Sequence, residues 1–263
     1  ILSLSRLLSL VESDLISSLG FLAKQKLPAK WNPVRIGITG PPGAGKSSLV
    51  NLLIAEYRKK GHKVGVLAVD PSSPFSGGAL LGDRVRMNAH AADPDVFIRS
   101  IGSRGGLGGL SAATGAMARV FELCGKDIVI IETVGVGQTE LEVMNLAYAT
   151  AVVLVPESGD VIQTLKAGIL EIADCFIVNK CDRPGAEILA HELKALVEQE
   201  EPNREGREIY LTSTTDPKNP LAKPISELAP HLLGLALELK SDPVRKALRA
   251  HGELRQLLLS KAV

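Results

Sequence analysis

One segment of the chain has residue types and spacing suited to chemistry, Gly40-Pro-Pro-Gly-Ala-Gly-Lys46-Ser47, which fits the pattern GxxxxGK[ST] without a mismatch. In such a loop, backbone N–H groups and the first turn of the following helix surround phosphate groups. The lysine reaches the terminal phosphates, and the serine hydroxyl binds Mg²⁺. An apolar run precedes the loop and an amphipathic run follows it, as this arrangement requires. The nucleotide-binding residues predicted here are Gly40, Pro42, Gly43, Ala44, Gly45, Lys46, Ser47 and Ser48.

A second short motif, Asn179-Lys180-Cys181-Asp182, follows another apolar run. Guanine carries two neighbouring donors, the ring N–H and the exocyclic amine, and the carboxylate of Asp182 can accept from both. Adenine lacks that pair of donors and would leave the carboxylate desolvated without partners, which is costly. We expect Lys180 to pack over the base and Asn179 to tie this loop to the phosphate loop. The two motifs together predict a site for GTP rather than ATP.

Two carboxylates, Asp70 and Glu132, stand at the ends of apolar runs that are predicted strands. The carboxyl ends of parallel strands face the ligand crevice, and Mg²⁺ prefers oxygen ligands. The sequence therefore predicts that Asp70, Glu132 and Ser47 hold Mg²⁺ directly or through water. Asp83 is a third acidic candidate, for which a helix cap is an equal alternative.

The segment Glu132-Thr-Val-Gly135-Val-Gly137-Gln138 predicts a link between hydrolysis and shape. The backbone N–H of Gly135 is expected to contact the γ-phosphate, and loss of that phosphate would release the loop. The catalytic candidates are therefore Lys46, Glu132 and Gly135. The loop-like composition of Asp70–Gly78 predicts a first switch segment beside the metal. Because no side chain stands out as a strong general base, intrinsic turnover is expected to be slow.

From Val34 onwards, short apolar runs alternate with longer amphipathic runs. The expected strands are Val34–Thr39, Lys63–Asp70, Val96–Ile101, Asp127–Glu132, Ala151–Pro156, Cys175–Asn179 and Glu208–Thr212. The expected helices are Ser47–Lys60, Ser111–Cys124, Thr139–Ala147, Val161–Ala173 and Ala186–Glu200. This alternation predicts an α/β fold with a doubly wound, mostly parallel sheet. The glycine-rich segment Gly102–Gly115 is predicted to be a flexible connector.

Both ends of the chain have helical patterns. Leucines at helical spacing predict an N-terminal helix that Pro28 and Pro33 end. After a turn-rich linker, Asp216–Pro224, helices are expected over Ile225–Leu239 and Pro243–Ser260. We therefore divide the chain into an N-terminal helical extension at 1–33, a P-loop GTPase domain at 34–215 and a C-terminal helical extension at 216–263.

The composition of the 263 residues excludes several classes of protein. Hydrophobic residues make up 45% and charged residues 22%, which excludes wholesale disorder. A net charge of +1 and only 3% aromatic residues argue against a nucleic-acid partner. The longest apolar stretch is too short to span a bilayer, so no membrane association is expected. Three cysteines without metal-ligand spacing predict buried free thiols in a cytoplasmic protein, or in the mitochondrial matrix of a eukaryote.

Four segments occur in an order that resembles the MeaB/ArgK family of P-loop GTPases: GITGPPGAGKSSLV, VDPSSPFSGGALLGDRVRM, ETVGVGQTE and NKCD. That family is related to the metallochaperone GTPases of the SIMIBI class. The resemblance extends from about Leu2 to Asn179 and beyond. A glutamate at Glu132, where most GTPases have aspartate, is a mark of this group. Members of the family are chaperones of adenosylcobalamin-dependent acyl-CoA mutases, such as methylmalonyl-CoA mutase.

The resemblance implies roles that the residues alone do not indicate. It assigns Asp70, Asp83 and Glu132 to the magnesium site and makes Pro156–Lys166 a loop that signals to the mutase. It places Thr212-Ser213-Thr214 where the family has a TSA-like sequence that completes the guanine pocket. It also implies GTP or GDP as ligand, Mg²⁺ as cofactor, adenosylcobalamin only through the partner mutase, and a homodimer formed by a C-terminal extension, which is short here.

Two other functions remain open from the residues. An ATP-dependent metabolite kinase would use the same phosphate loop, but the motif that ends in Asp182 argues against it. A metal-delivery GTPase for a nickel or zinc enzyme belongs to a neighbouring branch, whose members usually carry His-rich or CxxC ligands. The sequence has neither pattern.

Overall fold

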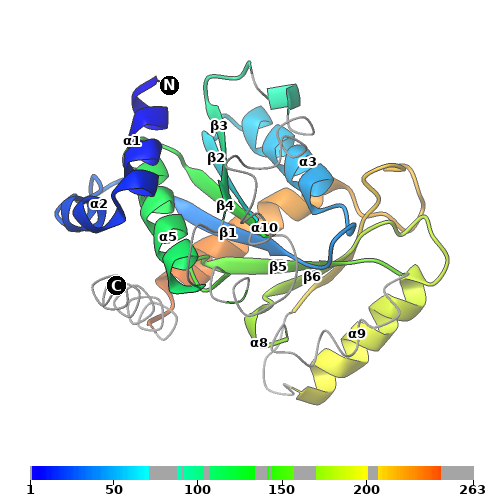
Figure 1. Ribbon diagram of the computed structural model, residues 1–263. Helices are drawn as coiled ribbons and strands as arrows, with labels where there is room; N and C mark the ends of the chain where they lie inside the picture. Colours follow the sequence, from blue (N-terminus) through cyan, green and yellow to red (C-terminus); the bar gives the residue numbers. More distant parts are fainter. Residues whose placement is uncertain are drawn as a thin grey trace.

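The computed structural model describes residues 2–70, 88–90, 92–102, 107–133, 141, 144–156, 170–200 and 207–243. Seven strands within these ranges form one sheet, in the order β3-β2-β4-β1-β5-β6-β7, and every neighbouring pair is parallel (Figure 1). The strands are β1 (Val34–Thr39), β2 (Val64–Asp70), β3 (Val96–Gly102), β4 (Ile128–Thr133), β5 (Ala149–Leu154), β6 (Cys175–Val178) and β7 (Ile209–Leu211). The expected parallel sheet is confirmed.

Helices cover both faces of the sheet, which makes the fold doubly wound. The helical elements are α1 (Leu2–Ser13), α2 (Leu15–Leu22), α3 (Lys46–Lys59), η1 (Asn88–His90), α5 (Leu107–Leu123), α8 (Leu170–Ile172), α9 (Ala186–Glu200) and α10 (Ile225–Ser241). Apolar residues of α3 and α10 pack against one face, and those of α5 and α9 pack against the other. The helices α1 and α2 lie outside α5, on the side of the molecule away from α9 (Figure 1).

The strand order determines where a ligand can bind. The strands that follow β4 in the chain all lie on the far side of β1, so the direction of winding reverses at β1. In open α/β sheets, ligands bind at such a switch point, beyond the carboxyl ends of the strands. The loops that follow β1, β6 and β7 meet at this end, where β4 also ends with Glu132 and Thr133, and they carry many of the predicted site residues.

Several strands are nearly uninterrupted apolar runs in the sequence because they are buried on both faces of the sheet. All residues of β1, β4, β5 and β6 are buried. Ile36 and Ile38 face the core formed with α3 and α10, whereas Val129 and Ile131 face Met117 and the other core residues around α5. Each fully buried side chain of this size contributes about 1.5–3 kcal/mol. The two cores therefore hold the carboxyl edge of the sheet as a rigid support for the loops.

The N-terminal segment differs from the single helix predicted for it. It forms two helices because Asp14 breaks the first and caps the second, where its carboxylate accepts from the Ser17 N–H at 3.1 Å. A capping aspartate is favoured at a helix start and disfavoured in a helix interior. Leu8 and Val11 of α1 are buried in the core around α5.

Two other predicted bounds are corrected. The strand expected at Ala151–Pro156 runs from Ala149 to Leu154, because Ala149 and Thr150 already pair with β1. The segment Gly102–Gly115, predicted as a flexible connector, is helical from Leu107 onwards. The packing of Met117 and other buried residues of α5 outweighs the low helix propensity of its glycines.

Several predictions fall on residues outside the described ranges. They include residues 139, 140, 142 and 143 of the helix expected at Thr139–Ala147, residues 161–169 of the one expected at Val161–Ala173, and the helix expected at Pro243–Ser260 beyond residue 243. The division of the chain at residues 33 and 215 stays a prediction. No helix within the described residues is long and apolar enough to cross a membrane. The cysteines are free thiols, but only Cys175 and Cys181 are buried; Cys124 is exposed, contrary to the prediction.

Candidate functional site

The phosphate loop lies between β1 and α3 and depends on glycine at two positions. Gly40 has φ 142° and Gly45 has φ 85°, conformations that side chains with a Cβ rarely adopt. A Cβ at Gly40 would lie 2.0 Å from the carbonyl oxygen of Val153, and one at Gly45 would lie 2.4 Å from Nδ2 of Asn179. The close packing of this loop against β5 and the loop after β6 therefore excludes other residues.

Lys46 is the first residue of α3, and its side chain folds back over the phosphate loop. Its Nζ donates hydrogen bonds of 2.8 Å to the carbonyl oxygens of Gly40 and Pro41, and the residue is buried. No side chain caps the start of α3 at Gly45. The first N–H groups of a helix have no partners within the helix and bind anions well. The loop thus presents an ammonium group and a helix amino terminus at one place.

The other predicted loop positions differ in exposure. Ala44 is buried, and its carbonyl faces inward; Pro42, Gly43 and Ser48 are exposed. Gly43, with φ 76°, has open space around its Cβ position. Pro42, Gly43 and Ser48 therefore lie on the solvent-exposed side of the loop, whereas Ala44 packs into the core.

The predicted metal ligands Ser47 and Glu132 are brought together by the structure. Glu132, near the end of β4, is 2% exposed, and its Oε1 accepts a 2.7 Å hydrogen bond from the Ser47 hydroxyl. The two residues lie 85 positions apart in the chain. Asp70 ends β2 next to β4, in a register where Ala68 pairs with Glu132. The side chain of Asp70 and the residues Asp83 and Gly135 lie outside the described parts of the structure.

A hydroxyl and a carboxylate in contact form a donor set that suits Mg²⁺, which prefers oxygen ligands. Within the described residues, no three His, Cys, Asp or Glu side chains are grouped so that they could hold a metal ion. Mg²⁺ is usually bound through one or two carboxylates, substrate phosphates and water. Ser47 and Glu132 fit such a site, completed by a nucleotide.

Asn179 joins three loops beneath the site. Its side chain is fully buried; Nδ2 donates to the carbonyl oxygen of Ala44 at 2.8 Å, and Oδ1 accepts from Thr212 Oγ1 at 3.3 Å. The tie to the phosphate loop that the sequence predicted is therefore present. Oγ1 of Thr214 would lie 3.9 Å from a Cβ at Gly45, which places Thr214 beside the same loop. The loops after β1, β6 and β7 thus form one unit.

The loop after β6 turns sharply at Lys180. Lys180 has φ 57°, and it is the one residue other than glycine with a positive φ among those that the structure describes. This turn allows the N–H of Cys181 to donate to the carbonyl oxygen of Thr212 at 3.0 Å and leaves Asp182 exposed at the tip of the loop. Strained conformations of this kind concentrate at functional sites.

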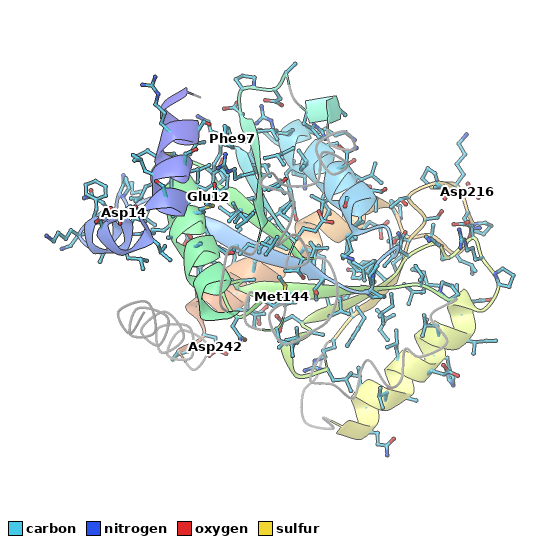
Figure 2. All side chains as sticks on the ribbon, in the orientation of Figure 1. Glu12, Asp14, Phe97, Met144, Asp216 and Asp242 are labelled. Carbon is cyan, nitrogen blue, oxygen red and sulfur yellow. The ribbon has the colours of Figure 1, made fainter. Side chains whose placement is uncertain are left out.

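Ser213 orients Asp182, a contact that the sequence did not predict. The buried Ser213 hydroxyl donates to Oδ1 of Asp182 and accepts from the N–H of Asp216 at 2.9 Å. Figure 2 labels Asp216 in the loop after β7, on the opposite side of the molecule from Glu12 and Asp14. No local pattern could have indicated the contact, because the two side chains are 31 residues apart.

Residues 4–233 match the profile of the methylmalonyl-CoA mutase-associated GTPase MeaB. The chain belongs to the MeaB family. In this MeaB-family chain, the loops that carry Lys46 and Asp182 are joined through the side chain of Asn179.

Curated relatives of this MeaB-family chain are longer than the chain itself. A protein of Pyrococcus horikoshii with a GTPase name is 50% identical over 198 residues, which are 75% of this chain and 62% of that protein. GTPase ArgK of Escherichia coli is 43% identical over 59% of this chain and 47% of its own length. The mouse methylmalonic aciduria type A homolog, mitochondrial, is 40% identical over 66% of this chain and 43% of its own length. The matched part thus spans about two fifths to three fifths of these relatives.

Solved structures show the same fold. The crystal structure of a LAO/AO transport system kinase superposes with a TM-score of 0.74 at 25% identity, covering 98% of this chain and 78% of that chain. The hydrogenase maturation factor HypB from Archaeoglobus fulgidus has a TM-score of 0.54 at 17% identity, covering 90% of this chain and all of its own. The fold is therefore that of the SIMIBI-type P-loop GTPases, as predicted.

Proposed function

We propose that the chain is a GTPase unit that hydrolyses GTP to GDP and phosphate and changes conformation as it does so. The observation that carries this proposal is the buried hydrogen bond from Asn179 to the carbonyl oxygen of Ala44. It joins the loop that ends in Asp182 to the loop that holds Lys46. One ligand with a guanine at one end and phosphates at the other spans both loops, which is the chemistry of GTP.

The residues around the phosphate loop have distinct tasks in this reaction. Lys46 moves its ammonium from the carbonyl oxygens of Gly40 and Pro41 to the terminal phosphates, where positive charge stabilises the transition state. The N–H groups of the loop and of the first turn of α3 donate to the phosphate oxygens. Ser47 and Glu132 hold Mg²⁺ directly or through water; when bound, the ion neutralises charge between the β- and γ-phosphates. Gly135 is proposed to donate its N–H to the γ-phosphate.

Guanine is selected by the carboxylate of Asp182. One oxygen already accepts from Ser213, so the plane of the carboxylate is held while its remaining lone pairs accept from the two guanine donors. Adenine has no such pair of donors and would cover the remaining lone pairs of the carboxylate without donating to them, which is costly. Thr212 and Thr214 support this pocket from the loop after β7, and Lys180 packs over the base.

The switch is proposed to serve an adenosylcobalamin-dependent acyl-CoA mutase, as a chaperone in cofactor loading or protection. The name of the family refers to methylmalonyl-CoA mutase, and the mouse relative is named for methylmalonic aciduria. The corrinoid cofactor would belong to the mutase. Slow intrinsic hydrolysis fits this role, because a partner can then control the lifetime of the GTP state.

Hydrolysis by the purified chain tests the proposal. GDP and phosphate are quantified after incubation with GTP and Mg²⁺, and in parallel with ATP. We expect equal amounts of GDP and phosphate without any added acceptor, and much slower turnover of ATP. Faster turnover of ATP would contradict the preference for guanine, and a need for a small-molecule acceptor would show a kinase instead. Capture of a cobalamin-dependent mutase that depends on whether GDP or a non-hydrolysable GTP analogue is bound would support the chaperone role; capture that is the same with both would contradict it.

A further inference from the structure

A pair of buried threonine hydroxyls lies beneath the phosphate loop. Thr39 is the last residue of β1, and Thr133 is the last residue of β4. The Thr133 hydroxyl donates to Oγ1 of Thr39 at 2.8 Å. Thr39 is 1% exposed and Thr133 is 0% exposed, so bulk water does not compete for this hydrogen bond.

Their positions connect the two loops that the phosphate chemistry needs. Thr39 immediately precedes Gly40, the first residue of the phosphate loop, and Thr133 immediately follows Glu132. The strand register pairs Ile38 with Glu132, so the hydroxyl bond closes the next step of the same pair of strands. Both strands end at this step, β1 at Thr39 and β4 at Thr133.

The hydroxyl pair and the magnesium ligands lie on opposite faces of the sheet. Side chains alternate along a strand, so Thr133 points away from the face on which Glu132 meets Ser47. Thr133 therefore does not touch the metal site. It acts on the position of the β4 backbone, and through that backbone on the carboxylate of Glu132.

Given the proposed function, we infer that Thr133 is a positioning residue for the magnesium site: its bond to Thr39 holds the end of β4 against the start of the phosphate loop, which keeps the carboxylate of Glu132 in reach of the Ser47 hydroxyl. A metal ligand has to be held within a few tenths of an ångström by its supporting contacts, and loss of such a contact weakens metal affinity by about 10–100-fold. The bond is buried, short and between two strand ends, which makes it suited to this task.

The test separates magnesium-dependent from magnesium-independent nucleotide binding. The release rate of GDP labelled with a fluorescent N-methylanthraniloyl group is measured in excess EDTA and in saturating Mg²⁺, and the ratio of the two rates gives the contribution of the metal. For Thr133→Val, which keeps the shape and removes the hydroxyl, we expect this ratio to fall by about tenfold. The rate in EDTA should stay within about twofold of the wild-type rate, because the contacts of the phosphate loop itself are kept.

Three further variants make the result specific. Thr133→Ser keeps the hydroxyl and should retain the wild-type ratio. Thr39→Val removes the acceptor and should reproduce the effect of Thr133→Val, and the double variant should add little to either, because both remove the same bond. Thr150→Val changes another buried threonine, near the start of β5, and should leave the ratio unchanged. Circular dichroism and thermal melting establish that each variant folds; if Thr133→Val does not, Thr39→Val tests the same prediction.

The outcomes distinguish this inference from the proposed function. A wild-type chain that does not bind the labelled GDP would overturn both. A wild-type chain that binds it with a clear magnesium effect, together with a Thr133→Val variant of unchanged ratio, would overturn the positioning role alone. Faster release by the variant in EDTA and in Mg²⁺ to the same extent would have the same meaning, because the bond would then support only the fold.

Discussion

The two ends of the central sheet use polar residues in different ways. At the carboxyl end, Lys46 donates to backbone carbonyl oxygens and Ser47 donates to Glu132. At the amino end, Arg35 of β1 meets Glu122 of α5 in a buried ion pair. The first set of contacts involves groups that phosphate or a metal ion can take over. The second set is closed, because the charges already neutralise one another.

The cluster at the amino end leaves little for a ligand to replace. Nε of Arg35 donates to Oε1 of Glu122 at 2.7 Å, and the second oxygen accepts from Arg35 at 3.2 Å and from Arg119 at 3.1 Å. The side chain of Glu122 is 1% exposed. The indole N–H of Trp31 donates to the backbone oxygen of the same residue at 3.2 Å. This cluster therefore fastens the segment before β1 to α5.

The polar residues at the amino end of the sheet stabilise the fold, whereas those at the carboxyl end form the candidate ligand site. The carboxyl end, where the winding of the sheet reverses, carries the phosphate-loop glycines with positive φ, Gly40, Gly43 and Gly45, and hydrogen bonds whose donors can turn to a ligand. At the amino end, the buried carboxylate of Glu122 is paired with both Arg35 and Arg119. Substitutions at the carboxyl end should change nucleotide chemistry, and substitutions at the amino end should change the free energy of unfolding.

The largest effect is expected for Lys46→Ala. Removal of a charged donor aimed at the transition state typically lowers turnover by about 10²–10³-fold. The free energy of unfolding should change by only about 1 kcal/mol, because two ordinary hydrogen bonds are lost. Lys59→Ala is the control on the same helix, where the lysine is exposed and paired with Glu56. Phosphate release checks the prediction; a Lys46→Ala variant as active as the control would contradict it.

Glu122→Gln should have the next largest effect, of the opposite kind. Removal of the charge leaves Arg35 buried without its full partner and should lower the free energy of unfolding by about 3 kcal/mol. Urea denaturation at neutral pH measures this change, with Glu192→Gln on the exposed side of α9 as the control, for which less than about 0.5 kcal/mol is expected. The affinity of the folded protein for GDP should stay the same. A loss of GDP affinity without a loss of stability would show that the two ends are not separate.

The glycines on either side of α3 allow the two ends of the sheet to be compared with the same substitution. Gly45, with φ 85°, immediately precedes α3, and Gly61, with φ 81°, lies just after its end. Alanine at either position should cost about 1–2 kcal/mol of stability, because a Cβ disfavours this conformation. Only at Gly45 would the Cβ meet Nδ2 of Asn179; around Gly61 there is open space. Titration with labelled GDP should therefore show weaker binding for Gly45→Ala and unchanged binding for Gly61→Ala.

The smallest expected effect is on the pH dependence of stability, through Glu122 at the amino end of the sheet. Burial alone would raise the pKa of Glu122, but the attraction and hydrogen bonds of Arg35 and Arg119 outweigh it and hold the pKa below its ordinary value. A carboxyl whose pKa is lower in the folded state stabilises the fold above its unfolded pKa, and the contribution is lost as the pH falls through the folded value. Below about pH 4 the stability of the wild type should therefore approach that of Glu122→Gln. A difference that stays constant from pH 7 downwards would contradict the ion-pair account.

Much of the fold could be predicted from the sequence because the sheet is built from local patterns. The run Val34–Thr39, buried on both faces, was predicted with the bounds that the structure has. The spacing of Gly40, Lys46 and Ser47 indicated the phosphate loop because the chemistry lies in consecutive residues. The contact of Asn179 with the phosphate loop could be predicted because Asn179 is the first residue of the motif that ends in Asp182.

Other features could not be predicted because they depend on residues distant in the chain. Arg35 and Glu122 are 87 positions apart, and Thr39 and Thr133 are 94 apart. No periodicity indicates that such side chains will face one another. The break at Asp14 and the early start of α5 at Leu107 had a different cause. In both cases capping or packing outweighed the propensity of the local sequence.

The central claim is that one nucleotide spans the joined loops and that Asp182 selects its base. Calorimetric titration of the wild type and of Asp182→Asn with GDP and with xanthosine diphosphate tests it most directly, because xanthine offers an acceptor where guanine has its amine. We predict that the variant loses affinity for GDP by at least about a hundredfold and gains affinity for xanthosine diphosphate. Unchanged GDP affinity in the variant, with no binding of the xanthine nucleotide, would contradict the account.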